Sequence, residues 1–226
     1  MESTTIIMLV VIFVLMYMVY YYFMSSKSML LSSIIPGTQQ TMISANTLDT
    51  SSTKGAVNFS YSIWFNINDW NYNYGKVKTL FRRGDTSTHV YFAETVNDLN
   101  IVIKDISGND LTCVVKNIPI QKWVNLLISV YGKSLDVYIN GKLVKTCILN
   151  AVPKVDSKDP LYITPDGGFK GWVTQFQYWA DSTDPQTAWN LYKRGNGSNI
   201  FSNMFGNYGL KVALMSDGTE QSAITI

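Results

Sequence analysis

The feature that most constrains this chain is a run of twelve residues, 57–68, in which every second residue is apolar. The apolar positions hold Val, Phe, Tyr and Ile, and the positions between them hold mainly Asn and Ser. Successive side chains of a strand point to opposite faces, so this period of two predicts a strand with one buried face. A helix with the same residues would carry polar groups on every side. The chain is therefore expected to build its core from β-structure.

Shorter apolar runs bounded by turn residues follow this strand. Asn140-Gly141 separates two of them, and Asn-Gly between apolar runs is a strong hairpin signal. One helix is predicted, with Asp184 as its N-cap, Pro185 in its first position and Gly195 as its stop. Many short strands and one helix predict an all-β sandwich of two sheets over residues 55–195. Residues 196–226 are expected to form a C-terminal extension with added strands.

The N-terminus has a different composition. Ile6 to Met24 is nineteen residues of Ile, Met, Leu, Val, Phe and Tyr only. As a helix this stretch would be about 28 Å long, close to the ~30 Å hydrocarbon core of a bilayer. A cleaved signal peptide fits less well, because the preceding residues include Glu2 and no Lys or Arg. We expect residues 1–24 to be a single transmembrane anchor and residues 25–54 a polar linker.

Charge and composition exclude several classes of function. Eighteen basic and sixteen acidic residues give a net charge of +2, which excludes a strongly electrostatic nucleic-acid binder. The small basic group of Lys76, Lys78, Arg82 and Arg83 is interpreted as a solvated strand face, so no nucleic-acid partner is expected. One histidine, His89, and two cysteines exclude zinc fingers and most histidine-based catalytic sites.

An ordered series of motifs resembles a known family. Together these segments are similar to the concanavalin A-like jelly roll of the laminin-G and pentraxin type, over about residues 55–195. The resemblance implies a two-sheet jelly-roll sandwich, and the fold alone does not define a function. The segments are Tyr61–Phe65, Leu80–Gly84, Gln121–Asn125, Leu135–Lys142 and Gly168–Trp172.

A closer likeness is to membrane-anchored proteins of large DNA viruses that infect algae and amoebae. It depends on four segments: Cys113-Val114-Val115, Asn117-Ile118-Pro119, Trp123-Val124-Asn125 and the turn from Ile163 to Phe169. This resemblance implies a minor capsid or virion membrane protein that links an internal membrane to the capsid shell, with capsid proteins as partners. The alternative is a membrane-displayed, lectin-like protein that binds a glycan. Lys27, just after the apolar stretch, favours the cytosolic side for the domain. A viral shell would assemble on an internal membrane from that side, so the expected location is the internal membrane side of the capsid.

Catalysis is not expected. Retaining glucanases of this fold carry a Glu-x-Asp-x-x-Glu pattern, and the only glutamates after residue 54 are Glu94 and Glu220. Glu94 and Asp98 are four residues apart in a predicted turn, and His89 alternates with apolar residues. We therefore expect no enzyme activity and assign no catalytic or cofactor-binding residue.

Calcium is the weaker of two open ligand hypotheses, because laminin-G and pentraxin domains often bind it through Asp oxygens. The candidates here are Asp156, Asp159, Asp166 and Asp181. Aspartate in a Gly- and Pro-rich turn usually serves the turn itself. No metal ligand is therefore assigned.

Aromatic and sulfur residues give the remaining expectations. Trp70, Tyr72 and Tyr74 alternate with Asn in a predicted loop and form a candidate contact loop for a glycan or a protein. Packing of this loop onto its own sandwich is the equal alternative. Trp123 and Trp172 are expected to be core residues. The likeness to the viral proteins implies a disulfide between Cys113 and Cys147, with two buried free thiols as the alternative.

Overall fold

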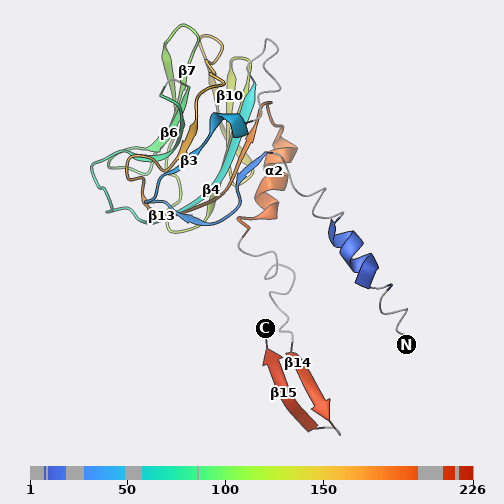
Figure 1. Cartoon of the computed structure of the whole chain (residues 1–226). Coiled ribbons are helices and arrows are strands. Elements are labelled where there is room, and N and C mark those ends of the chain that lie inside the picture. The colour runs from blue at the N-terminus through green and yellow to red at the C-terminus, as the bar shows by residue number, and fades with distance from the viewer. Residues whose placement is uncertain are drawn as a thin grey trace.

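The chain folds into two antiparallel sheets packed face to face, as Figure 1 shows. This computed structural model describes residues 8, 10–18, 28–48, 58–85, 87–197, 211–216 and 219–225. The seven-stranded sheet has the order β1 (Met29–Leu31), β13 (Lys170–Trp179), β4 (Phe59–Asp69), β9 (Val124–Tyr131), β10 (Ser134–Ile139) and β11 (Lys142–Ile148), with β2 (Ile35–Pro36) also paired to β13. The six-stranded sheet has the order β3 (Thr41–Ile43), β12 (Leu161–Ile163), β5 (Lys78–Arg83), β6 (Thr88–Phe92), β7 (Leu99–Lys104) and β8 (Asp110–Val115).

The alternating run becomes the central strand β4. Its five apolar positions from Phe59 to Ile67 are at most 1% exposed and belong to the core between the sheets. The expected hairpin at Asn140-Gly141 is also present, because Asn140 and Gly141 both have positive φ and connect β10 to β11. The predicted two-sheet sandwich is confirmed.

Residues 28–48, which were expected to belong to a polar linker, are part of the sandwich. Residues 29–43 supply β1 and β2 to one sheet and β3 to the other, so this segment completes one edge of both layers. Leu48 is 4% exposed, and Leu30, Leu31, Ile35 and Ile43 pack against the core. The prediction failed because strands of two or three residues are too short to show alternation. Residues 25–27 and 49–54 lie outside the described part of the chain.

The opposite edge of the sandwich is closed covalently. β8 and β11 are the outer strands of the two sheets, and Cys113 on β8 forms a disulfide with Cys147 on β11 (S–S 2.04 Å). The Lys145 ammonium also donates to the carbonyl oxygen of Val114 at 2.9 Å. The sheets are thus joined by a side-chain hydrogen bond and a disulfide at this edge.

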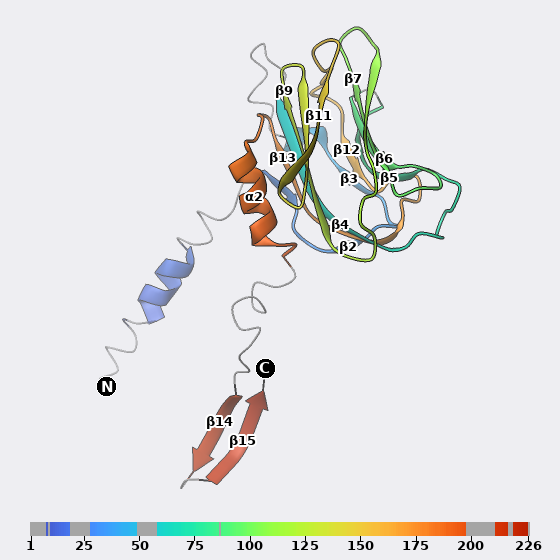
Figure 2. The same ribbon diagram turned by 180° about the vertical axis from the view of Figure 1, so that it is seen from behind.

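The helix α2 (Pro185–Arg194) lies on the outer side of the seven-stranded sheet, as Figure 2 shows. Its N-cap is Asp184, whose carboxylate accepts the Thr187 backbone N–H at 2.8 Å, and it ends at Gly195, as predicted. Ala188 and Leu191 pack on Leu127 and Tyr138 in a second, smaller apolar cluster. The outer face of this sheet is therefore partly covered.

Trp123 and Trp172 are not core residues, contrary to expectation. Trp172 is 41% exposed, and Trp123 is half-buried just before β9 begins. The inward positions are taken by their neighbours Val124 and Val173, which are fully buried. Because side chains alternate along a strand, each tryptophan then faces away from the core.

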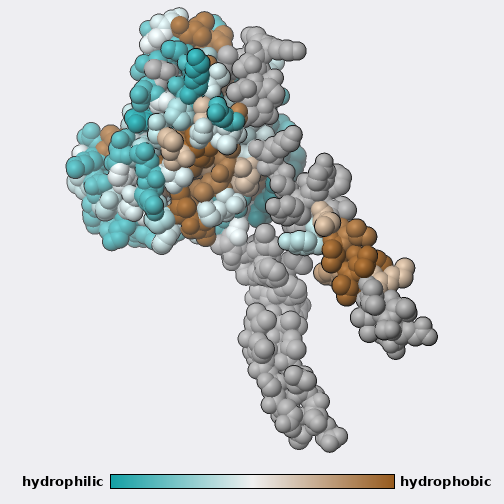
Figure 3. Space-filling model, in the orientation of Figure 1, coloured by the Kyte–Doolittle hydropathy of each residue, from teal (hydrophilic) through white to brown (hydrophobic). Residues whose placement is uncertain are grey.

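The two ends of the chain add smaller elements. Residues 10–18 are helical and apolar, and Figure 3 shows them as hydrophobic surface. Within the described residues no helix is both long and apolar enough to cross a membrane, while residues 1–7, 9 and 19–24 of the expected span lie outside them. A short 3-10 helix covers Ala45–Thr47. In the C-terminal extension, β14 (Lys211–Ser216) and β15 (Thr219–Thr225) pair with each other as a two-stranded sheet.

Candidate functional site

A row of side chains crosses the outer face of the six-stranded sheet, one from each strand. Consecutive cross-strand partners define the row Met42–Tyr162–Arg82–His89–Val102–Thr112. Directly paired residues of an antiparallel sheet project to the same side. The row alternates with the buried row that contains Phe81, Val90 and Ile101, so its six side chains face away from the core.

A second outward row lies beside the first. Thr79 pairs with Tyr91, Tyr91 with Asn100 and Asn100 with Val114. Tyr91, Asn100 and Val114 are outward by the same alternation and are half-buried. An irregularity in β5 between Thr79 and Phe81 puts Thr79 on this side as well, where it is buried against His89. The two rows place hydroxyl, guanidinium, imidazole and amide groups on one surface, which we call the polar sheet face.

Aromatic rings and cations contact one another within the polar sheet face. The Arg82 guanidinium lies 5.4 Å from the centre of the Tyr162 ring, and the His89 and Tyr91 rings are 4.6 Å apart. The Thr79 hydroxyl and His89 Nε2 are 3.1 Å apart. These contacts hold the rings and the polar groups in fixed positions relative to each other.

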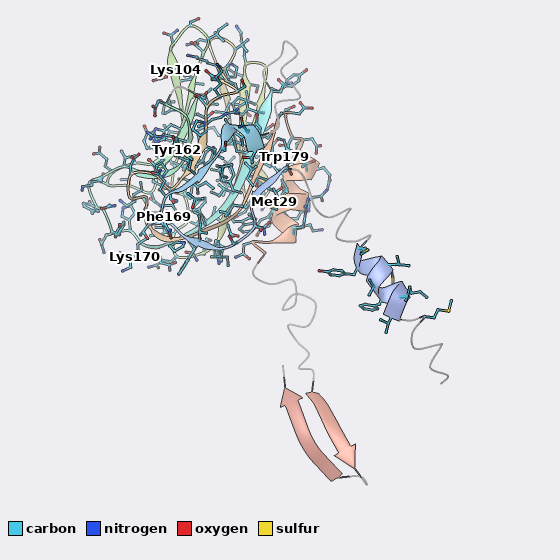
Figure 4. The ribbon with its side chains drawn as sticks, in the orientation of Figure 1. Met29, Lys104, Tyr162, Phe169, Lys170 and Trp179 are labelled. Atoms are coloured by element: carbon cyan, nitrogen blue, oxygen red, sulfur yellow. A yellow bond between two sulfur atoms is a disulfide. The ribbon has the colours of Figure 1, made fainter. Side chains whose placement is uncertain are left out.

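A pocket of about 280 Å³ opens at one end of this face. Arg82, His89 and Lys104 line it together with Asp85 and Asp110. Figure 4 labels Lys104 on β7 and Tyr162 on β12. The lining is mainly polar, with Ser87 and Thr88 hydroxyls beside the charged groups, so the pocket offers many hydrogen-bonding groups and little apolar surface.

The charges of the pocket are balanced. Arg82 lies 3.6 Å from the carboxylate of Asp85, and Lys104 lies 3.4 Å from that of Asp110. Burial, and secondly the neighbouring Arg82 charge, lowers the pKa of His89 below its ordinary value. The imidazole is therefore neutral at neutral pH, with one nitrogen able to donate and the other to accept. The pocket suits a neutral, hydroxyl-rich ligand better than an ion.

The turn beside the pocket depends on a glycine. Gly84 has a φ of +51°, and a Cβ on it would lie 2.3 Å from the Asp159 carboxyl carbon. Asp159 in turn accepts the Ser87 hydroxyl at 3.0 Å, which fixes the chain between β5 and β6. A side chain at position 84 would displace this carboxylate and open the pocket wall.

The basic strand face expected from the sequence is only partly solvated. Lys78 and Arg83 are at most 1% exposed. Lys78 lies 4.6 Å from the centre of the Trp70 ring, and burial lowers its pKa. Arg83 donates to the hydroxyls of Tyr61 and Tyr178, at 3.2 and 3.1 Å. Of this group, Arg82 reaches the polar sheet face.

The predicted contact loop, with Trp70, Tyr72 and Tyr74, leads directly into β5. The Trp70 ring meets Phe92 edge-on at 6.0 Å and packs against the core. Tyr72 is half-buried, and Tyr74 is 60% exposed. Because β5 runs from this loop to the pocket, the loop and the pocket lie at opposite ends of the strand. Trp70 therefore packs the loop onto the sandwich, as the alternative interpretation expected, while the exposed Tyr74 ring is accessible to a ligand.

Three of the four calcium candidates, Asp156, Asp159 and Asp181, accept hydrogen bonds within the protein. Asp156 and Asp181 accept backbone N–H groups of Lys158 and Ser182 at 2.9 and 2.7 Å. Asp98 accepts the backbone N–H of Asn117 at 2.9 Å. Across the described residues no three His, Cys, Asp or Glu side chains are grouped closely enough to hold a metal ion.

Comparison with known proteins identifies the family. Residues 37–188 match the profile of the concanavalin A-like lectin/glucanases superfamily. The chain belongs to this superfamily. The match includes β3, which lies in the segment expected to be a linker, and ends within α2. No curated protein sequence matches the chain.

Several solved structures share the fold of this superfamily member. The receptor binding domain of botulinum neurotoxin C/D mosaic serotype is 18% identical, with a TM-score of 0.51, over 61% of this chain and 36% of that one. The binding domain of botulinum neurotoxin DC, in complex with rat synaptotagmin II, is 16% identical, with a TM-score of 0.55, over 69% and 40%. The serotype G binding domain is 17% identical, with a TM-score of 0.51, over 73% and 45%. The chain thus matches less than half the length of each of these three proteins.

Sequence reasoning missed the polar sheet face. The sequence shows His89 as a single histidine in an alternating apolar run, and Arg82 as one member of a solvated strand face. Tyr162 lies 73 residues beyond His89 in the chain, although only one strand separates them in the sheet. The alternation within each strand indicates which of its residues face outward. It does not indicate which strands are neighbours, and that order is needed to bring these residues into one row.

Proposed function

We propose that this chain is a non-enzymatic, membrane-anchored lectin that binds a neutral carbohydrate on the polar sheet face. The observation that carries the proposal is the row through Tyr162, Arg82 and His89, with the pocket at its end. A pyranose has an apolar C–H face that packs on an aromatic ring and a rim of hydroxyls that needs donors and acceptors. Tyrosine rings beside a guanidinium, an imidazole and an amide meet both needs.

The anchor and the fold support the proposal in different ways. The apolar stretch from Ile6 to Met24 has the length and composition for one membrane crossing. The superfamily includes lectins, so the fold is compatible with sugar binding. The neurotoxin domains have receptor-binding roles of their own. At 16–18% identity, their likeness to this chain concerns the fold and not the receptor.

The test is binding of the full chain, held in detergent micelles or nanodiscs, to an array of neutral and acidic oligosaccharides. We expect binding to neutral sugars, with at least a tenfold loss for Tyr162→Ala, about 1.4 kcal/mol. Tyr131→Ala is the matched control, because Tyr131 is a 69% exposed tyrosine on the other sheet. Absence of binding to every sugar would reject the proposal, and equal loss in both variants would reject the site.

A second candidate is a structural role as a virion protein that links an internal membrane to capsid proteins. It is favoured by the resemblance of the Cys113–Val115 and Ile163–Phe169 segments to viral membrane proteins. In this fold these segments form the disulfide-bearing strand β8 and the turn before β13. They therefore support a common fold more directly than a common location. Imaging of an assembled particle, with the domain between membrane and shell, would favour this candidate over a displayed lectin.

A further inference from the structure

Tryptophans and unpaired cations gather on the other sheet, at the end where β4 finishes and β13 begins. We call this surface the tryptophan end. It consists of Trp123, Trp172 and Trp189 with Lys122, Lys142, Lys193 and Arg194. It lies on the outer face of the seven-stranded sheet, opposite to the proposed sugar site.

Trp172 and Trp189 lie on either side of a stacked pair of rings, Trp64 and Tyr192, on the same face. Trp172 pairs with Asn66, two residues along β4 from Trp64, so both indoles are on the outer face. The Trp64 ring is buried beneath the Tyr192 ring, with centres 5.8 Å apart, and the Tyr192 ring is 5.7 Å from that of Trp189. Trp172 and Trp189 nevertheless remain 41% and 38% exposed. Large aromatic side chains that stay partly exposed next to one another are typical of a surface that binds another molecule or a membrane.

The cations around these rings have no acidic partner among the described residues. Lys193 and Arg194 form the last turn of α2, and Lys142 follows Gly141, where a Cβ would lie 3.0 Å from the Trp189 ring. The nearby carboxylate of Asp69 pairs with Lys170 at 3.6 Å. Asp184 lies at the opposite end of α2, so positive charge is concentrated at the tryptophan end.

The chain itself brings this sheet close to any membrane that it enters. β1 begins at Met29, and the apolar stretch ends at Met24. Four intervening residues reach at most about 18 Å when fully extended. β1 pairs with the later part of β13, at Phe176 and Gln177, and β2 pairs with its first part, at Trp172 and Val173. The chain thus enters the sheet about five residues along β13 from Trp172 and reaches the tryptophan end through β2. A bilayer crossed by residues 6–24 would therefore lie within reach of the seven-stranded sheet.

We propose that the tryptophan end rests on the headgroup region of a bilayer that contains anionic lipid. Indole rings prefer the boundary between headgroups and acyl chains, and clustered Lys and Arg are attracted to anionic headgroups. This inference rests on the anchor in the proposed function. Docking by this face directs the polar sheet face, on the opposite layer, away from the membrane and toward a ligand.

Quenching of tryptophan fluorescence by brominated lipid tests the proposal in the full chain. All six tryptophans lie between positions 64 and 189, and none is in the apolar stretch, so quenching reports only the approach of the sandwich. The chain is reconstituted in vesicles of brominated phosphatidylcholine, with or without phosphatidylserine. We expect stronger quenching with phosphatidylserine, and weaker quenching as salt is added.

Paired variants separate this surface from general charge effects. Lys193→Glu with Arg194→Glu should remove the phosphatidylserine dependence. Lys116→Glu with Lys158→Glu, an equal charge change at exposed positions on the six-stranded side, should leave it unchanged. Trp172→Phe with Trp189→Phe should lose more than half of the quenching.

Each contrary result has a distinct meaning. A chain that floats with the vesicles but shows no lipid-dependent quenching overturns the docking surface alone. A chain that does not float with either vesicle overturns the anchor and the docking surface together. Preferential binding of a nucleic acid or an acidic polysaccharide at the tryptophan end, suppressed by Lys193→Glu with Arg194→Glu, would also overturn the lipid assignment.

Discussion

His89 connects the stability of this protein to pH. Its folded-state pKa is lowered, first by burial and then by the charge of Arg82. The unfolded imidazole, with a pKa of about 6.5, therefore binds a proton at a pH where the folded one does not. Above about pH 6.5 the ring is neutral in both states, and His89 does not reduce the stability of the fold. As the pH falls below that value, the unfolded state is favoured because its imidazole binds the proton more readily.

We predict that His89→Gln makes the protein less sensitive to mild acid. The glutamine side chain removes the titrating group, so the melting temperature should change less between about pH 7.5 and about pH 5.5 than in the parent chain. Thermal unfolding followed by circular dichroism at both pH values measures this difference. An unchanged pH dependence in the variant would show that His89 is not desolvated in the folded state.

Replacing Arg83 should reduce the free energy of unfolding much more than replacing its neighbour Arg82. The Arg83 guanidinium is inside the sandwich and bonds to the hydroxyls of Tyr61 and Tyr178, and burial raises the pKa of Tyr61 to about 12. Arg83→Ala should destabilise the chain by about 3–5 kcal/mol, because it leaves buried hydroxyls without partners and a cavity.

Denaturant unfolding of Arg83→Ala and Arg82→Ala compares the two positions. Arg82 pairs with Asp85, whose side chain is 84% exposed, so its loss should cost less than about 1 kcal/mol. Equal losses in the two variants would contradict the burial of Arg83. Two adjacent arginines thus have different roles, and only their positions in the sheet distinguish them.

At the scale of elements, the disulfide joins β8 and β11, the outer strands of the two sheets, which do not pair with each other. Cys113 and Cys147 are 34 residues apart, and closing a loop of this length is worth about 4 kcal/mol on the chain-entropy account. Reduction should therefore lower the melting temperature of the parent chain. The Cys113→Ala/Cys147→Ala double variant should melt lower and show no further response to reductant. A parent chain that is insensitive to reductant would contradict this role.

The segment before β4 gives a second test at this scale. A chain that begins at residue 28 keeps β1, β2 and β3, and we expect it to unfold cooperatively. A chain that begins at residue 55 lacks an edge strand in each sheet and the buried Leu48, so we expect it to aggregate or to lose cooperative unfolding. Cooperative unfolding of the shorter chain would restore the linker interpretation.

Elements were predictable from sequence in proportion to their length and periodicity. β4 alternates over eleven residues and α2 has a cap at each end, so both could be identified from local pattern. β2 has two residues and β1 and β3 have three, and their pairing depends on strands far along the chain. The faces of Trp123 and Trp172 were assigned wrongly because one residue of register exchanges the two sides.

At the scale of the whole molecule, the fold class was predictable and the candidate site was not. Period-two patterns and turn residues are local, whereas the polar sheet face combines six strands in the order β3-β12-β5-β6-β7-β8. No local pattern encodes that order. The proposed arrangement has two working surfaces on opposite layers, one toward the bilayer and one toward a sugar. The proposed orientation depends on the anchor sequence and on β1, which follows it closely and belongs to the seven-stranded sheet.

Hydrogen–deuterium exchange tests the central claim most directly. The full chain in nanodiscs is compared with and without the neutral oligosaccharide that binds it most tightly on an array. We predict slower exchange in the strands of the polar sheet face, above all in β5, β6 and β12, with no change in β10 and β11. Protection confined to the seven-stranded sheet, or no protection in the presence of any sugar, would contradict the account.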